Sequence, residues 1–196
     1  MKPNINFLFE IGSLRKVPRA WQQVMTAQVQ NISEHIFRTA LIAWTIAEAE
    51  DADIGKVLKI CLIHDIAESR ATDIAFMHRD YVTRHEDTAQ IDILKGTLIE
   101  KEATELLKEY EERETLEAKI VKDADNLEVD LELKELARVG DTAAIGMQKH
   151  HRHIVREQKL YTKTAMEIWD LIQTTDPDEW HQELTDKWVN NKNAAR

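Results

Sequence analysis

A histidine and an aspartate stand side by side, as His64 and Asp65, in a helix-forming and largely apolar stretch, residues 60–69. Glu68 follows them by one helical turn. A buried charge costs several kcal/mol unless it is paired, hydrogen-bonded or bound to a metal. The adjacent His and Asp therefore favour a divalent metal ion as their partner, although such a dipeptide alone is a weak signal.

Two other segments offer further ligands. His35 falls in the first turn of a helix predicted for residues 33–50. Asp125 shares a helix face with Val121 and Val129, so it should point toward the core. Two imidazoles and two carboxylates suit an ion such as Mn, Co, Fe, Ni, Mg or Zn, with positions left open for water. Taken singly, each residue is more often an ordinary hydrogen-bonded side chain than a ligand.

The order of these residues and their surroundings resemble the HD superfamily of metal-dependent phosphohydrolases. The similarity is to the branch with bacterial 5′-deoxynucleotidases and their eukaryotic HD-domain relatives. Residues 64–74 resemble its signature HDxAExxxxDI, residues 118–125 resemble AKxVKxxD, residues 33–35 resemble its first-histidine motif, and residues 14–21 resemble its L(K/R)xVPR segment. The likeness extends from about residue 7 to residue 185.

This resemblance implies an all-α fold, a single-domain HD-type helical bundle over residues 1–196, with one divalent metal ion. The implied ligands are His35, His64, Asp65 and Asp125. A metal ion would assist phosphate ester hydrolysis, because it lowers the pKa of bound water and neutralises phosphate oxygens. His78 and His85 are candidates for a second metal. Relatives with two metals carry an adjacent His-His pair before the last Asp, and none lies between His85 and Asp125 here, so a mononuclear site is favoured.

The resemblance also implies roles for four more residues. Glu68, at i+4 from His64, would exchange a proton with metal-bound water or the leaving oxygen. Asp73 would line the sugar or leaving-group side, and Arg19 would hold the phosphate, which suits a bidentate guanidinium. Trp21 is the candidate sugar contact. The bacterial members place Trp directly after the Arg, whereas one residue intervenes here.

The favoured activity is hydrolysis of deoxynucleoside 5′-monophosphates to deoxynucleoside and phosphate. An alternative within the superfamily is a deoxynucleoside triphosphate triphosphohydrolase that releases tripolyphosphate. Hydrolysis of guanosine alarmones ranks lower, because it expects an acidic pair where Glu68 and Ser69 stand. A non-enzymatic alternative is a metal-containing nucleotide-binding protein.

Composition sets further bounds. The chain has 196 residues and a net charge of −10, which argues against binding of nucleic acid polymers or membrane surfaces. It contains no apolar run of about 18 residues, and its first residues lack the shape of a secretion signal. The single Cys61 lies in an apolar segment, as expected of a buried thiol in a reducing cytoplasm. By family habit we expect a homodimer or higher homo-oligomer, with Phe7, Phe9 and the helix at 160–174 as candidate surface.

Scarce Gly and Pro, at 5 and 3 residues, favour helices throughout. We expect N-caps at Ser33, Asp53 and Thr115, and a stop at Gly140. Residues 70–78 should form an irregular loop at the site, and the tail after residue 190 should be frayed. The predicted helices cover residues 5–14, 21–28, 33–50, 53–68, 80–95, 98–112, 115–139, 142–156, 160–174 and 178–190.

Overall fold

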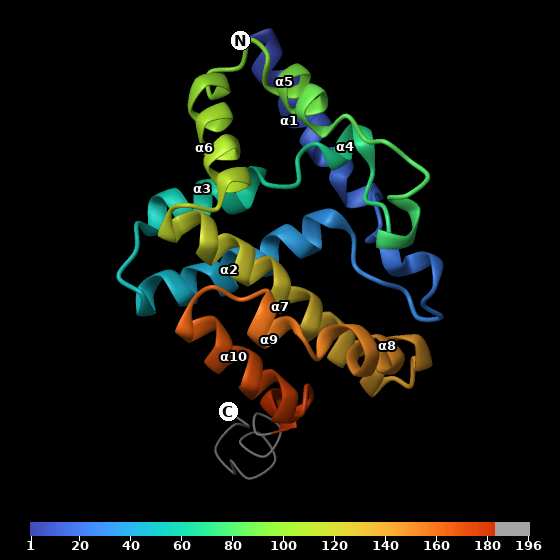
Figure 1. Ribbon diagram of the computed structural model, residues 1–196. Coiled ribbons are helices and arrows are strands. Elements are labelled where there is room, and N and C mark those ends of the chain that lie inside the picture. Colours follow the sequence, from blue (N-terminus) through green and yellow to red (C-terminus); the bar gives the residue numbers. More distant parts are fainter. Residues whose placement is uncertain (183–196) are drawn as a thin grey trace, which may run out of the picture.

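The computed structural model describes residues 1–182 of the chain, and within that range it is built of helices (Figure 1). The all-α prediction is confirmed, since the described residues contain no strand beyond one isolated bridge between Pro18 and Asn31. The α-helices are α1 Lys2–Ile11, α2 Ile32–Ala49, α3 Ile54–Ile63, α4 Glu68–Ala71, α5 Glu86–Leu94, α6 Glu100–Glu112, α7 Leu116–Arg138, α8 Thr142–Met147, α9 Val155–Gln158 and α10 Lys163–Thr174. Short 3-10 turns cover Gly12–Lys16, Ala20–Gln23 and Phe76–His78, and a π turn covers Gln148–Arg152.

Helix α7 is the central element of the bundle. It runs for 23 residues and packs against α2, α3, α6, α8 and α10 (Figure 1). The predicted cap is confirmed, because Thr115 Oγ1 accepts a hydrogen bond from the Ala118 amide at 3.2 Å. Gly140, with a φ of +88°, follows the helix end as expected. The buried cluster around α7 has members on α2, α3 and α10, among them Ile46, Ile60, Val121 and Leu127, each with no exposed surface.

Helix α2 begins one residue earlier than predicted. Ser33 is not its N-cap; Asn31 is, with Oδ1 accepting from the Glu34 amide at 3.1 Å. The Glu34 carboxylate accepts from the Asn31 amide at 2.9 Å in return. This reciprocal capping box needs an acid three residues after the cap, and Glu34 provides it for Asn31. His35 is still in the first turn and fully buried.

Helix α3 is shorter than the predicted 53–68. Its predicted cap Asp53 is confirmed, with Oδ1 accepting from the Lys56 amide at 3.0 Å, but the α-helix ends at Ile63. Beyond it the chain tightens into i to i+3 hydrogen bonds, such as Glu68 N to Asp65 O at 3.1 Å. In such turns side chains three residues apart eclipse each other, so Asp65 and Glu68 are brought onto one side.

The N-terminal segment departs most from prediction. A helix at 21–28 was expected, but only a 3-10 turn over Ala20–Gln23 forms. The amides of Thr26 and Ala27 instead donate to Asp141 Oδ2 at 2.7 and 2.9 Å. A side chain more than a hundred residues away thus takes the backbone donors that a helix would use, which local propensity cannot reveal.

Other boundaries shift by a few residues. The predicted helix at 142–156 is divided into α8, a π turn and α9, and the one at 80–95 is reduced to α5. Of the helix predicted at 178–190, residues 179–182 are helical, and the remainder lies outside the described residues, as does the predicted frayed tail. The single-domain assignment stays a prediction. Across residues 1–182, none of the helices combines the length and the apolar character that crossing a bilayer requires.

Asp123 ties α10 to α7. Its buried carboxylate accepts from the Tyr161 amide at 2.7 Å, and from the Thr162 amide and hydroxyl at 2.8 and 2.7 Å. We expect Asp123→Ala to lower the free energy of unfolding by about 2–4 kcal/mol, because it leaves several buried donors unpaired. Urea denaturation measures this. The matched control is Lys163→Ala, whose exposed ion pair with Glu167 should matter by less than about 0.5 kcal/mol. Equal urea denaturation curves for the two variants would contradict the role of Asp123 in holding α10 against α7.

Candidate functional site

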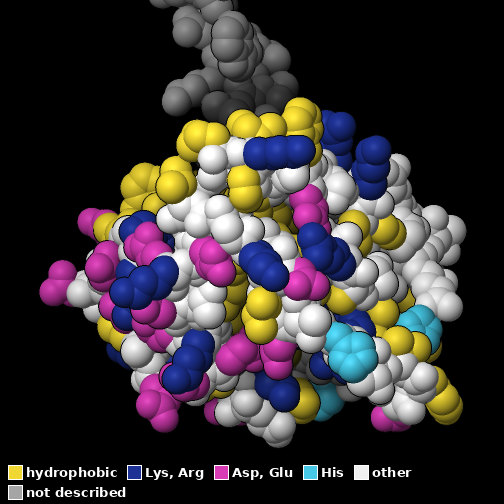
Figure 2. All heavy atoms as spheres, turned by 90° about the horizontal axis from the view of Figure 1, so that it is seen from above, with side chains coloured by type: hydrophobic (Ala, Val, Ile, Leu, Met, Phe, Trp, Pro, Cys, Tyr) yellow, Lys and Arg dark blue, Asp and Glu magenta, His cyan; other side chains and the backbone are white. Residues whose placement is uncertain are grey.

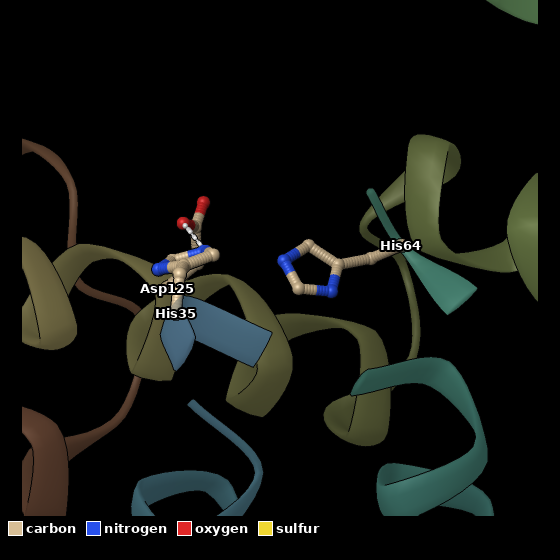
Figure 3. A group of neighbouring side chains, drawn as sticks. All are labelled: His35, His64 and Asp125. Carbon is tan, nitrogen blue, oxygen red and sulfur yellow. Dashed lines mark ion pairs between the residues drawn. The ribbon is translucent and has the colours of Figure 1, made fainter. Parts of the chain in front are cut away.

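Three predicted ligands meet at one point in the bundle. His35 comes from the start of α2, His64 caps α3, and Asp125 lies in the middle of α7. One potential ligand atom from each lies within 4.8 Å of the others. Figure 3 shows the imidazole of His64 facing the pair formed by His35 and Asp125. Residues separated by up to 90 positions are therefore brought together, as the sequence pattern predicted.

The ring of His35 is oriented by a buried carboxylate. Its Nδ1 lies 2.7 Å from Glu128 Oε2, and neither side chain has exposed surface. Its Nε2 lies 3.3 Å from Asp125 Oδ1 and 3.4 Å from Asp65 Oδ2. Burial and the nearby charge of Arg19 lower the pKa of His35, but these three carboxylates outweigh both effects and raise the pKa well above its usual value. The surroundings of Nε2 thus suit a positive charge, either a proton or a metal ion.

The ring of His64 is likewise oriented by a partner at its Nδ1. Its Nδ1 lies 2.8 Å from the carbonyl oxygen of Cys61, to which an N–H donates. That tautomer leaves the Nε2 lone pair free, and Nε2 is buried with no hydrogen-bond partner. Ligating histidines commonly donate their other ring N–H to a carbonyl or carboxylate in this way. Both imidazoles therefore present an unpartnered Nε2 to the same point.

Asp65 and Asp125 supply the negative charge. Asp65 Oδ2 lies 3.4 Å from Nε2 of each histidine. Burial raises the pKa of both carboxyls, but neighbouring groups hold each below its usual value, chiefly His64 for Asp65 and Lys122 for Asp125. Two carboxylates and two imidazole nitrogens with lone pairs fit a divalent ion, and the donor set leaves coordination positions free.

Glu68, the first residue of α4, lies beside this cluster. Its side chain is buried, and Oε2 has no hydrogen-bond partner. Burial, together with the negative charges of Asp65 and Asp73, raises the pKa of Glu68 to about 9. Arg84 Nη1 lies 3.8 Å from Glu68 Oε1. In the chain itself Glu68 holds a proton at neutral pH.

Asp73 is held by a strained turn. Thr72, just before it, has a φ of +55° and a ψ of 160°, a region that an L-residue rarely adopts and that costs about 1–3 kcal/mol. Arg84 donates to the Thr72 carbonyl at 2.8 Å. Asp73 Oδ2 accepts from the Ala20 amide at 2.9 Å and lies 3.6 Å from Arg19 Nε. The turn thereby joins the segment that carries Asp73 to the N-terminal segment that carries Arg19 and Ala20.

Arg19 and Trp21 have different positions relative to the site. Arg19 is buried, with Nη1 3.5 Å from Asp65 Oδ2. The ring of Trp21 lies 4.6 Å from the Arg19 guanidinium carbon, and its indole N–H donates to Glu132 at 2.8 Å. Arg19 lines the cavity at the site, whereas Trp21 packs behind Arg19 and is not among the lining residues. A direct contact of Trp21 with substrate stays a prediction.

A polar cavity of about 470 Å³ opens onto the cluster. The candidate residues His64, Asp65, Glu68, Asp73 and Asp125 line it together with Arg19. It also contains cations that sequence reasoning did not assign, namely Arg79, Arg84, Arg113 and Lys122. Negative and positive groups are therefore concentrated in one small volume, as a site for a metal ion and an anion requires.

Sequence reasoning missed Glu128, the partner of His35. It lies three residues after Asp125 on the same face of α7, so its spacing was a usable signal. It also missed Tyr110, whose ring packs edge-on against His64 with centroids 5.5 Å apart. That contact joins segments far apart in the chain and leaves no local pattern.

Known proteins are similar to this chain over much of its length. A family model described as HD domain matches residues 11–169. The chain belongs to the HD domain family. Among curated HD relatives, the 5′-deoxynucleotidase HDDC2 of Danio rerio is 34% identical over 141 residues, with 67% of this chain and 68% of that protein covered. The human 5′-deoxynucleotidase HDDC2 is 32% identical over 137 residues, covering 67% of each.

Solved structures share the HD fold. A conserved hypothetical protein from Pyrococcus furiosus has a TM-score of 0.72 and 27% identity, covering 87% of this chain and 99% of that one. A protein from Magnetospirillum magnetotacticum, described as a predicted metal-dependent phosphohydrolase, has a TM-score of 0.63 and 25% identity, covering 88% and 93%. These similarities place the ten α-helices described within residues 1–182 in an HD-type bundle.

The contact between Glu128 and His35 gives a test of how the site is held. We expect Glu128→Gln to weaken Mn or Co binding by about 10- to 100-fold, because the amide carries no charge to support the imidazole. Calorimetry on metal-stripped protein measures this. Glu135→Gln is the matched control, since Glu135 accepts from the same Arg38 at 2.6 Å without touching His35. Equal affinities in both variants would show that Glu128 does not orient a ligand.

Proposed function

We propose that this HD-domain protein is a metal-dependent phosphomonoesterase that hydrolyses deoxynucleoside 5′-monophosphates to deoxynucleoside and phosphate. The observation that carries the proposal is the pair of unpartnered Nε2 atoms, on His35 and His64, turned to one point between two carboxylates. A buried acid and a buried Arg lie beside that point in a polar cavity. The names of the HDDC2 relatives supply the substrate class.

The proposed ion ligands are His35, His64, Asp65 and Asp125, and one divalent ion is the proposed cofactor. When bound, such an ion supplies neutralisation of phosphate oxygens and activation of water. The residues contribute orientation: Glu128 and the Cys61 carbonyl fix the two imidazole tautomers, and Lys122 holds Asp125 Oδ2 at 2.7 Å. These neighbouring groups thus fix the orientation of the side chains of His35, His64 and Asp125 before an ion binds.

Glu68 is the proposed proton carrier. As water oxygen attacks phosphorus, the bond to the 5′ oxygen breaks, and that oxygen needs a proton to leave as a neutral alcohol. Burial favours the protonated carboxyl of Glu68, which can donate that proton. The attacking water releases a proton in turn, so Glu68 is regenerated as the carboxylic acid.

Arg19 is the proposed phosphate contact and Asp73 the proposed contact on the sugar side. Arg19 is buried between Asp65 and Asp73, so its guanidinium is fixed before substrate binds. Trp21 supports that guanidinium with its ring, which is consistent with an indirect part in substrate binding. The extra cations of the cavity favour one alternative, a deoxynucleoside triphosphate as substrate, and product analysis distinguishes the two.

Partners and location extend the proposal. The proposed partner is a small nucleotide rather than a nucleic acid polymer, consistent with the net charge of −10. On the face drawn in Figure 2, basic and acidic side chains are interspersed, with hydrophobic side chains along one edge. A homodimer is proposed from the exposed Phe9 and Leu171, although Phe7 packs inward. A cytoplasmic location is proposed from the buried Cys61 thiol.

Product analysis tests the proposal. We expect metal-stripped protein supplied with Co, Mn, Mg or Zn to release phosphate from dAMP and much less from AMP. Phosphate and tripolyphosphate are measured separately, with dATP as a third substrate. The control is Asp125→Ala, which should abolish release and metal binding while the far-UV circular dichroism spectrum is kept. Tripolyphosphate from dATP with dAMP untouched would favour the alternative, and silence with every metal would favour a binding protein.

Glu68→Gln tests the proton carrier. We expect kcat to fall by about 10²- to 10⁴-fold with little change in KM or metal content, because the amide keeps the shape but carries no transferable proton. A kcat within about threefold of wild type would remove Glu68 from the mechanism.

The same variant has a predicted pH signature in metal-free protein. A folded-state pKa raised above the unfolded value of about 4.5 gives stability that is complete below that value and lost as pH rises through about 9. Wild type should therefore lose stability relative to Glu68→Gln between pH 5 and pH 9, in urea denaturation. If the free energies of unfolding of wild type and Glu68→Gln changed in parallel with pH, the raised pKa of Glu68 would be contradicted.

A further inference from the structure

Arg113 has a backbone conformation that normally belongs to glycine. It ends α6 with a φ of 54° and a ψ of 26°, in the left-handed region. Glycine is the usual residue at such a helix end, and a side chain there costs about 1 kcal/mol. A residue kept in an unfavourable conformation calls for a reason in its side chain.

The Arg113 guanidinium lines the polar cavity and lacks a counter-charge. Its carbon lies 3.4 Å from the centre of the Tyr110 ring, and its buried Nη1 has no hydrogen-bond partner. Within residues 1–182, no carboxylate lies at ion-pair distance from it. The cavity cations Arg19, Arg84 and Lys122 all have carboxylate partners. Arg79, the remaining cation of the cavity, is exposed to solvent.

A ring contact and a shared cavity place Arg113 near the proposed ion site. The Tyr110 ring that it covers packs against His64, so a single ring separates Arg113 from a proposed ligand. Arg113 also lines the same cavity as Lys122, which donates to the proposed ligand Asp125 at 2.7 Å. Arg19 enters the cavity beside Asp65 and Asp73, a different set of neighbours.

We infer that Arg113 is a second anion-binding residue of the cavity, which binds phosphate oxygens of the substrate and the phosphate product. The inference rests on the proposed function. The buried Nη1 of the half-buried Arg113 has no hydrogen-bond partner until an anion arrives, and Arg forms strong charge-assisted hydrogen bonds to phosphate. The Tyr110 ring fixes the position of the Arg113 guanidinium before the anion binds, so less conformational freedom is lost on binding.

Binding of inorganic phosphate to the full chain loaded with Mn or Co tests the inference by calorimetry. We expect Arg113→Met, which keeps an apolar cover over Tyr110, to weaken phosphate binding by about 10- to 100-fold, the loss of a charge-assisted hydrogen bond. Arg113→Gly should weaken it equally without loss of thermal stability, because glycine relieves the left-handed conformation. Lys108→Met, the same charge change on an exposed position of α6, should stay within about twofold.

Three results would overturn the inference. Wild-type phosphate affinity in Arg113→Met together with lower stability would make Arg113 a structural cover for Tyr110. Equal weakening in Lys108→Met would reduce the effect to net charge, and wild-type protein that does not bind phosphate would remove the site. Because binding needs no turnover, phosphate affinity that depends on Arg113 in a protein inactive on deoxynucleotides would disprove the proposed substrate and leave the anion site standing.

Discussion

The pairing of two buried imidazoles with carboxylates is the constraint on which the rest of the structure depends. His35 Nε2 faces Asp65 and Asp125, and its other nitrogen is held by Glu128. None of these charges is tolerable in a protein interior alone, because desolvation of a single ion costs several kcal/mol. Helices α2, α3 and α7 must therefore meet at a defined register, and the apolar cluster around α7 holds them there.

Local irregularity places the remaining groups. The change from α to 3-10 geometry after Ile63 keeps Glu68 on the same side of the chain as Asp65, three residues further along. The strained Thr72 turns Asp73 back toward Arg19 and the N-terminal segment. Both departures from regular geometry occur within ten residues of the His-Asp pair, as expected where the position of a side chain matters more than local stability.

Electrostatics explain how an acidic chain can hold a phosphate ester. The net charge of −10 is distributed over the whole molecule, whereas the cavity gathers several cations beside the carboxylates of the cluster. Most of these cations are paired within the protein, which fixes their positions. Attraction of a small anion then depends on the local field in the cavity and not on the total charge.

The sequence by itself determined the helical class, the caps at Asp53 and Thr115, and the four proposed ligands. The helical class and the caps rest on local composition and on spacing along one helix, which a linear pattern records. The four proposed ligands rest on the resemblance of several separate motifs to the HD superfamily. Only the tertiary structure decided the cap at Asn31, the end of α3 and the absence of a helix at 21–28, where Asp141 takes the amides. It also decided that Glu128 orients His35 and that Tyr110 lies between Arg113 and His64. These contacts join distant segments, so their energies depend on packing that no local window of the sequence contains.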